Sequence, residues 1–447
     1  MSDHGSSIPT AASMGDSEQV PVQKEPLPTL SEKEVANTNT PVPPESLLPA
    51  DSVYSWLVVL GSFLNLMLSV GATTTYGVYL QEYMQVEFPN VSSSYLSWIG
   101  TLQFALMCFF GIGVGVLCER IDTRILSGFG ALITGLSFII ASFCNSPWKL
   151  LITQGIMFGF GGSFLFITGL TLPPQWLVKY RAVGTGVAIA GSGIGGLWLS
   201  FATRAITENI SRRWALRITG LIIIGVCGCS SLLMRMRFRP AKRDKIFDTS
   251  VLRDKRFVFL FFGGMFGIGG FYIPFYFMPS YSNAVLGKSE SWGTNVAAIM
   301  NAASIAGRIA VGITADYVGP LNTLIVSTLL SCLSVLVLWL PFKDFGTFIA
   351  AGVVFGFCSG AIVSLIPVVT ASIFGIKRLP SIMGVLMIGY TAGALISTPP
   401  AGHMLDVYGH GTGYSSLIIY DGAFLAVSAA SELILRTILS RKLWRKA

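Results

Sequence analysis

Long apolar runs follow one another from about residue 51 to residue 440, separated by short polar segments. Most of the runs hold about 20 residues or more, the length that an α-helix needs to cross roughly 30 Å of hydrocarbon. The pattern therefore predicts an all-α membrane protein with twelve transmembrane helices. The expected spans are residues 53–79, 95–118, 124–144, 149–173, 183–205, 216–234, 257–281, 295–315, 322–341, 347–373, 382–404 and 415–438.

The first fifty residues are of another kind, rich in Ser, Thr, Pro and Glu without a hydrophobic period. This composition is typical of a disordered tail, and no apolar core that would mark a signal peptide follows the first Met within about thirty residues. The longest connection between spans is strongly basic and divides the spans into two sets of six. Its charge is explained by a role in enforcing the topology and attracting anionic lipid. A regulatory role of this loop is the alternative. The expected parts are a disordered cytoplasmic tail (1–50), a six-helix bundle (51–234), a basic cytoplasmic loop (235–256), a second six-helix bundle (257–440) and a short cytoplasmic tail (441–447).

Composition supports the membrane assignment. Hydrophobic residues make up 52% of the chain and charged residues 12%, with a mean hydropathy of +0.66, whereas soluble domains carry about 25% charged residues. Lipid must therefore solvate most of this chain. The net charge of +8 does not indicate nucleic acid, because the basic residues cluster between the apolar runs. The seven cysteines show neither metal-site spacing nor a disulfide framework.

Charge asymmetry between the loops predicts the orientation. An even number of spans puts both termini on one side, and the loops and tail on that side hold nineteen Lys and Arg residues against seven on the other. By the positive-inside rule both termini are cytoplasmic. The sequons at Asn90 and Asn209 then fall outside, where they are candidate glycosylation sites. Without a sorting motif, the plasma membrane is expected before the vacuole.

Arg308 lies in the middle of an expected span, from Asn295 to Asp316, that is otherwise apolar or small. A guanidinium cannot lose its charge by deprotonation, and near the bilayer centre it costs at least about 2.5–3.5 kcal/mol on insertion scales. It should therefore face a cavity, where it would bind an anionic solute, or lock helices together by pairing with a carbonyl or an acid. Both alternatives stay open at this point.

The two halves of the chain resemble each other at one offset. Gly155-Ile-Met-Phe-Gly-Phe160 returns as Gly352-Val-Val-Phe-Gly-Phe357, and Gly115 returns as Gly312, each with a shift of 197 residues. A duplicated six-helix unit predicts two pseudo-symmetric bundles with the solute site between them near the midplane.

At Gly115-Val-Leu-Cys-Glu119-Arg120-Ile-Asp-Thr-Arg124 the chain resembles the signature loop of the major facilitator superfamily, and Gly312-Ile-Thr-Ala-Asp316 is similar to its copy in the second half. The resemblance implies the major facilitator fold. It also implies that Glu119, Arg120 and Asp316 are gating residues, which make the cytoplasmic contacts that hold the outward-open state. This chain has Glu119 where the family usually has Asp.

The chain further resembles the fungal type of the monocarboxylate-porter branch over about residues 51–440. The motifs are Asp51-Ser-Val-Tyr-Ser-Trp56, Ser97-Trp-Ile-Gly100 and Lys179-Tyr-Arg-Ala-Val-Gly-Thr-Gly186. In that branch the arginine matched by Arg308 binds the substrate carboxylate. Proton-coupled lactate porters also carry an aspartate and a lysine where this chain has Ser304 and Thr74. Lactate transport by that mechanism is therefore in doubt, and a larger solute is favoured.

Other polar groups at membrane depth are candidates for the solute site, with satisfaction of a neighbouring backbone group as the alternative for each. With Arg308, the expected substrate-binding residues are Asn65, Thr74, Gln154, Tyr272, Tyr276 and Asn301. For coupling, the sequence offers the acids Asp421 and Glu432, of which Glu432 is spaced to pair with Arg436 four residues later, and His403. None of them is singled out as the coupling residue.

These features predict a secondary transporter that moves a small organic anion or carboxylate-bearing metabolite by alternating access, with efflux of a fungal secondary metabolite favoured and proton coupling left open. The alternatives are uptake of a monocarboxylate or flavin vitamin, and a membrane sensor that does not transport. No nucleophile–base set, metal cluster or phosphate loop is evident, so we expect neither an enzyme nor a cofactor.

Overall fold

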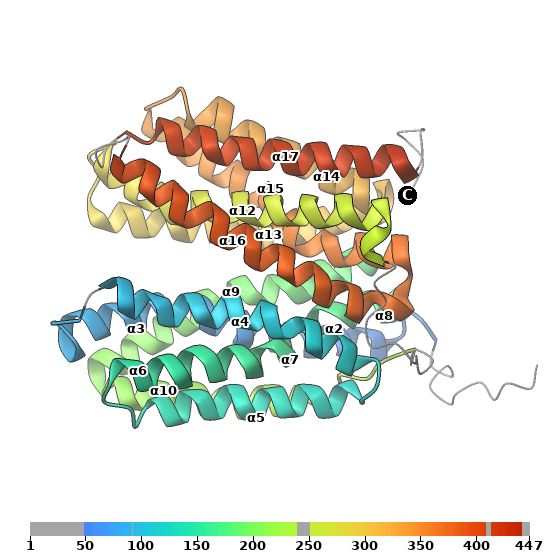
Figure 1. Ribbon diagram of the computed structural model, residues 1–447, viewed down its shortest axis with the longest axis horizontal. Coiled ribbons are helices and arrows are strands. Elements are labelled where there is room, and N and C mark those ends of the chain that lie inside the picture. Colours follow the sequence, from blue (N-terminus) through green and yellow to red (C-terminus); the bar gives the residue numbers. More distant parts are fainter. Residues whose placement is uncertain (1–48, 92, 239–250, 408–412, 440–447) are drawn as a thin grey trace, which may run out of the picture. The chain divides into compact units, whose positions relative to one another are not determined.

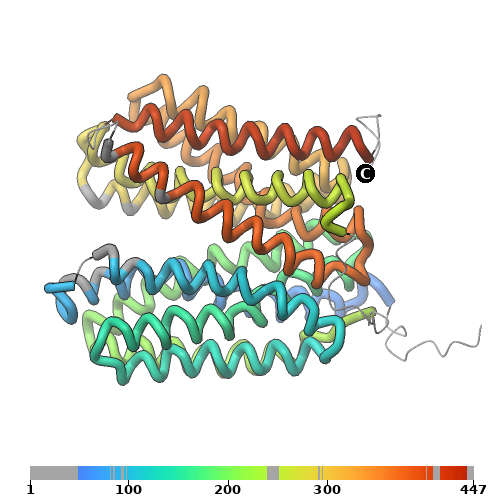
Figure 2. Tube along the Cα trace, in the orientation of Figure 1, coloured from blue at the N-terminus to red at the C-terminus, as the bar shows by residue number. Residues whose placement is uncertain are grey.

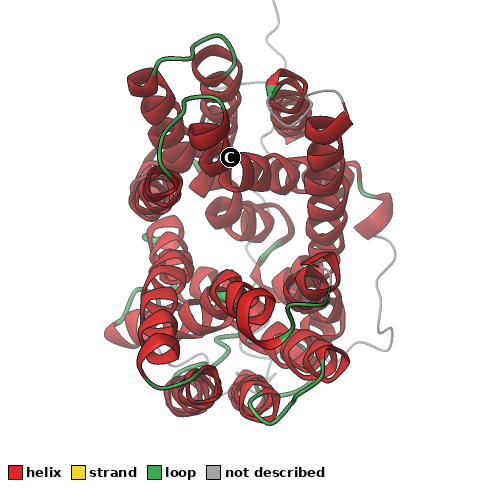
Figure 3. Ribbon diagram, turned by 90° about the vertical axis from the view of Figure 1, so that its left-hand side faces the viewer, coloured by secondary structure: helices red, strands yellow, loops and turns green. Residues whose placement is uncertain are grey.

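The computed structural model describes residues 49–91, 93–238, 251–407 and 413–439. Almost all of the expected N-terminal tail, the centre of the basic loop and the C-terminal tail lie outside the described residues. Contacts divide the chain after Pro44, and every described residue belongs to the second unit. In this described part all regular structure is helical (Figure 3).

Twelve of the described helices are long and apolar enough to cross a membrane, which confirms the number read from the hydrophobic pattern. Three of these spans pass through a π-helical stretch, at Leu151–Met157, Ile223–Cys227 and Ser334–Trp339, and a fourth stretch, Tyr83–Glu87, follows the first span. In chain order the spans are formed by α2 and α3 (Val53–Thr74 and Tyr76–Glu82), α4 (Ser93–Cys118), α5 (Thr123–Ala141), α6 and α7 (Pro147–Leu150 and Phe158–Thr171), α9 (Arg181–Asn209), α10 and α11 (Arg212–Ile222 and Gly228–Ser231), α12 (Lys255–Ala284), α13 (Glu290–Val318), α14 (Pro320–Leu333), α15 (Phe345–Phe374), α16 (Leu379–Val407) and α17 (Ser415–Leu439), while the short α8 (Pro173–Trp176) precedes α9.

Several helices begin earlier than the apolar pattern predicts. The sixth span begins at Arg212 rather than at residue 216, because the Ser211 hydroxyl accepts a hydrogen bond from the backbone N–H of Trp214 and so caps the helix. In the same way Asp122 caps α5 by accepting from the N–H of Arg124. Polar residues just before an apolar run thus cap the helix or form its first turn.

The spans form two bundles, as the internal repeat predicts. The spans from α2 to α11 pack on one another, and so do the spans from α12 to α17 (Figure 1). We call them the first and the second bundle. We call the end at which α2 begins and α17 ends the terminal end (right in Figure 1), and the other the distal end.

The bundles meet mainly through two helix pairs, α4 with α16 and α9 with α13. Figure 2 shows α4 and α16 drawing together toward the terminal end. There a Cβ added to Gly115 of α4 would collide with the carbonyl of Pro380, and one added to Gly312 of α13 would collide with the carbonyl of Ala182. The two glycines are 197 residues apart, and the starts of α9 and α16 that they touch are 198 residues apart, so the internal repeat relates both contacts within one residue. At these two positions only glycine permits so close an approach of the backbones.

Candidate functional site

Arg308 lies near the middle of its span, which runs from Asn295 to Val318. Its side chain is 7% exposed. Gly360 of α15 leaves room for it, since a Cβ there would press on Cγ of Arg308. The structure thus buries a permanent cation at membrane depth, where polar partners are needed.

One edge of the Arg308 guanidinium is held by the other bundle. Nη1 donates to the carbonyl oxygen of Ile189 at 2.9 Å and to the hydroxyl of Ser192 at 2.7 Å, both on α9. Nε is buried without a partner, and Nη2 makes no hydrogen bond to the described residues. The structure therefore realises the carbonyl pairing that the sequence left as an alternative, and the Nε–Nη2 edge makes no hydrogen bond to the described residues.

Two side chains lie beside Arg308. Ser304 is one turn earlier on α13, and its hydroxyl is buried without a partner. Tyr272 of α12 is within electrostatic range of Arg308, and its ring contacts that of Phe104 on α4 edge-to-face at 5.5 Å between centroids. Tyr276, one turn further, is 64% exposed. Arg308, Ser304, Tyr272 and Ser192 form what we call the central site.

Asn65, a predicted solute ligand, lies inside the first bundle instead. Its amide nitrogen donates to the Ser127 hydroxyl at 2.8 Å and its amide oxygen accepts from the Ser230 hydroxyl at 2.7 Å. The side chain is fully buried between three spans, where an amide satisfies polar groups of its neighbours. This placement does not support its prediction as a solute ligand.

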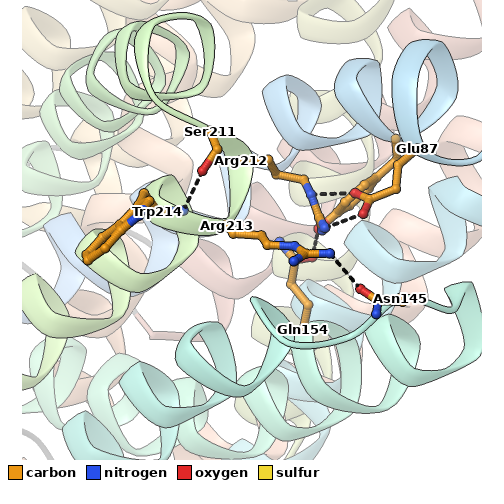
Figure 4. Close-up of polar contacts among 8 residues, drawn as sticks. Glu87, Asn145, Gln154, Ser211, Arg212, Arg213 and Trp214 are labelled. Atoms are coloured by element: carbon orange, nitrogen blue, oxygen red, sulfur yellow. Dashed lines mark hydrogen bonds and ion pairs between the residues drawn. The ribbon is translucent and has the colours of Figure 1, made fainter.

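Gln154 is also fully buried, in a polar cluster of the first bundle near the distal end (Figure 4). Its side-chain oxygen accepts from the Tyr83 hydroxyl at 2.8 Å, and Arg212 places its guanidinium over the Tyr83 ring while pairing with Glu87 at 2.5 Å. Burial raises the pKa of Tyr83, so the hydroxyl stays a donor. Arg212, which falls between the expected spans 183–205 and 216–234, is the buried half of this ion pair.

Thr74 and Asn301 take up carbonyls of their own helices. The Thr74 hydroxyl donates to the carbonyl of Gly71 and the Asn301 amide to that of Ala297. Each is the local bonding that the sequence left as an alternative. From the predicted substrate-binding residues we keep Arg308, Tyr272 and Tyr276 as candidates. We add Ser304 and Ser192 to these candidates.

The sequence carried a signal for both added serines. Ser304 stands one turn before Arg308, and Ser192 is the polar residue in a run of glycines. Neither could be assigned to the central site without knowing that α9 crosses α13 there.

The three predicted gating residues differ in what they contact. Asp316, near the terminal end of α13, accepts backbone N–H bonds from Ala182 at 2.9 Å and Val183 at 3.0 Å in the first turn of α9. Glu119 follows the end of α4, half-buried, and Arg120 is exposed. Asp316 therefore ties the second bundle to the first across the terminal end.

The predicted glycosylation residues are both exposed: Asn90 lies in the turn before α4, and Asn209 ends α9. No group of three His, Cys, Asp or Glu residues that could hold a metal ion is found in the described ranges.

Comparison with known proteins identifies the family. The sequence model of the Major Facilitator Superfamily matches two overlapping stretches of the chain, residues 58–339 and 294–446. The chain belongs to this superfamily. As a major facilitator protein it is a membrane transporter and not an enzyme, and its twelve spans are those of the fold.

Its relatives include fungal transporters. The MFS-type transporter pynF of Aspergillus niger is 29% identical over 89% of this chain and 92% of its own length. The agnestins efflux protein AgnL12 of Paecilomyces divaricatus is 29% identical over 96% and 98%. The probable transporter MCH2 of Saccharomyces cerevisiae is 28% identical over 92% and 88%.

Solved structures show the same fold. The human organic anion transporter MFSD10 superposes with a TM-score of 0.66 over 85% of this chain and 99% of its own, at 13% identity. The fucose:proton symporter FucP of E. coli gives 0.63 over 86% and 98%, at 15% identity.

Proposed function

We propose that this major facilitator protein is a secondary active transporter of a small organic anion, and that Arg308 binds the anion. The observation that carries the proposal is the guanidinium at membrane depth, with Nη1 held by α9, Nε buried without a partner, and Nη2 making no hydrogen bond to the described residues. A planar guanidinium edge matches the two oxygens of a carboxylate, and such charge-assisted pairs are the stronger hydrogen bonds in proteins.

The surroundings of that edge favour a carboxylate on an apolar or planar body. Ser304 offers a further hydroxyl, and the rings of Tyr272, Tyr276 and Phe104 offer aromatic surface. The names of two relatives, the agnestins and the aspyridones efflux proteins, favour export of a fungal metabolite. The competing hypothesis is uptake of a monocarboxylate or a flavin vitamin.

Alternating access requires the terminal end to open and close. In our proposal the contact of Asp316 with the start of α9 holds this end shut. Glu119 and Arg120 serve the related interface, where α4 meets α16. From the positive-inside rule we propose that the terminal end, with both termini, faces the cytoplasm, and that the protein lies in the plasma membrane.

Uptake into proteoliposomes tests the anion site. The panel is lactate, pyruvate, benzoate, riboflavin and acidic fungal metabolites, run with wild type, Arg308→Ala and Arg308→Lys. The control is Arg204→Ala, which removes an exposed arginine paired with Glu208. A hydrogen bond to a charged group contributes about 1.5–3 kcal/mol, so we expect Arg308→Ala to lower uptake of the transported anion about ten- to hundredfold.

Arg308→Lys should restore little, because an ammonium cannot span both carboxylate oxygens. Equal uptake by wild type and Arg308→Ala would show that Arg308 only joins the bundles. Preference for lactate or riboflavin would favour nutrient uptake. A folded wild type that moves nothing on the panel would favour the sensor.

A further inference from the structure

Glu432 of α17 is a carboxyl buried in the second bundle, 1% exposed. Its Oε1 accepts from the hydroxyls of Thr328 on α14 and Ser428 on α17, each at 3.3 Å, and its Oε2 is buried without a partner. Gly263 of α12 makes room for it, since a Cβ there would lie 3.3 Å from Cγ of Glu432.

No cation neutralises this carboxyl within the described ranges. The expected pair with Arg436 does not form: Nε of Arg436 donates to the Asn322 amide oxygen of α14 at 2.7 Å. Asp421 lies three turns away on α17, also fully buried. An ionised carboxylate without a cationic partner is strongly disfavoured in such an interior, so Glu432 binds a proton in this conformation.

Tyr390 of α16 connects Glu432 to the interface between the bundles. Its hydroxyl is buried without a hydrogen bond and lies in electrostatic range of both Glu432 and Cys108 of α4. Gly264 of α12, next to Gly263, leaves the space for its ring. Two adjacent glycines of α12 thus make room for the Glu432 side chain and for the Tyr390 ring, which both pack against this helix.

The link matters because α4 and α16 belong to different bundles and must shift when the transporter changes state. Tyr272 is in electrostatic range of Tyr390, Cys108 and Arg308. Glu432 and the central site therefore interact electrostatically through Tyr390 and Tyr272. A shift of α16 would change the groups that surround the Glu432 carboxyl.

We propose that Glu432 is the proton-binding site of this transporter and that Tyr390 couples it to the α4–α16 interface. In the described conformation the Glu432 carboxyl is protonated. In the other conformation its O–H bond breaks, the proton passes to water, and the carboxylate remains until a proton returns. The Thr328 and Ser428 hydroxyls both donate to Oε1, so the proton is carried by Oε2, which is buried without a partner. The proposal deepens the proposed function and rests on it.

The first arm of the test needs no solute. Infrared difference spectra between about pH 5 and about pH 9, on either side of the range in which a buried carboxyl titrates, are recorded for the protein in nanodiscs. We expect a protonated-carboxyl band that changes with pH in wild type and is lost in Glu432→Gln. The pH-dependent band should persist in Asp421→Asn. Both Asp421 oxygens are buried without a partner, so we expect this carboxyl to stay protonated at both pH values and not to contribute to the difference spectrum. An unchanged band in Glu432→Gln would overturn the proposal.

The second arm measures pyruvate accumulation, and that of any other panel anion whose uptake depends on Arg308, in proteoliposomes under a gradient of about one pH unit, with protein-free liposomes as the background. At one proton per solute this supports about tenfold accumulation in wild type. Glu432→Gln and Tyr390→Phe should lose this accumulation yet still exchange the anion across the membrane, and Asp421→Asn should keep it.

The two arms separate the proposals. Wild-type accumulation in Glu432→Gln would overturn the proton site, while the anion site would stand. If wild type moves no panel anion, the proposed function fails, and the infrared arm alone decides whether Glu432 exchanges a proton.

Discussion

Replacing Asp316 should open the terminal end. Helix α9 begins at Arg181 without a side-chain cap from Tyr180, the preceding residue, and the first N–H groups of a helix need acceptors. Asp316 supplies them from the other bundle through both carboxylate oxygens. In the conformation with the terminal end open, these N–H groups would lose that acceptor.

The size of the effect follows from this contact. Hydrogen bonds to charged groups contribute about 1.5–3 kcal/mol each, and the positive end of the α9 dipole adds about 0.3–1 kcal/mol. Asp316 is half-buried and water replaces part of the loss, so we expect Asp316→Ala to destabilise the closed terminal end by about 2 kcal/mol. That changes the ratio of the two conformations roughly thirtyfold.

Spin labels report this ratio as a distance distribution. Lys179 and Tyr317 are exposed near the facing ends of α9 and α13, and both are replaced by Cys. Of the seven native cysteines only Cys229 is exposed, so Cys229→Ser removes the competing label site. Asp316→Ala should add a population at longer distance. Asp316→Asn, which keeps one acceptor oxygen, should add a smaller one.

A matching thermal unfolding midpoint shows that the variants remain folded. If Asp316→Ala gives the same distance distribution as its parent, the cap does not hold the terminal end, and our reasoning on gating is wrong.

Three further predictions concern other parts of the molecule. Gly115→Val should block the closed terminal end, because its Cβ would meet a backbone carbonyl of α16, and the same spin labels would show the long-distance population dominating. Arg212→Met should destabilise the fold by about 3 kcal/mol, which is at the low end for a broken buried pair because Glu87 keeps 23% exposure. In thermal unfolding, adding Glu87→Gln should recover part of the lost stability. An unchanged Tm of the single variant would contradict this prediction. Asn90→Gln and Asn209→Gln should each remove a glycosidase-sensitive gel shift if the distal end faces outside, whereas wild type without any shift would leave both sequons unused.

Much of the fold could be predicted because lipid imposes its constraint locally. Each span must be apolar and about 20 residues long wherever its neighbours lie, so the spans at Phe345–Phe374 and Lys255–Ala284 were recognisable one by one. Helix boundaries were less accurate. Capping depends on polar residues outside the apolar run, as at Ser211, which starts the sixth span at Arg212.

The candidate site was predicted only in part. Arg308 was recognisable because a permanent cation at membrane depth is costly in any arrangement of helices. Asn65 and Gln154 looked equally suitable, since the sequence shows that an amide is buried without showing what satisfies it. Their partners, such as Ser127 and Tyr83, come from other spans.

The sequence by itself determined the class of protein, the number of spans, the duplication and the presence of a buried cation, because each follows from composition, length or spacing along one chain. Only the tertiary structure decided that Arg308 reaches Ser192 across the bundle interface, that Asp316 caps α9, and that Glu432 accepts hydrogen bonds from Thr328 and Ser428 rather than pairing with Arg436. These contacts join residues more than a hundred positions apart, or choose between neighbours on one helix. Their existence depends on how helices cross, and the hydrophobic pattern does not encode the crossing.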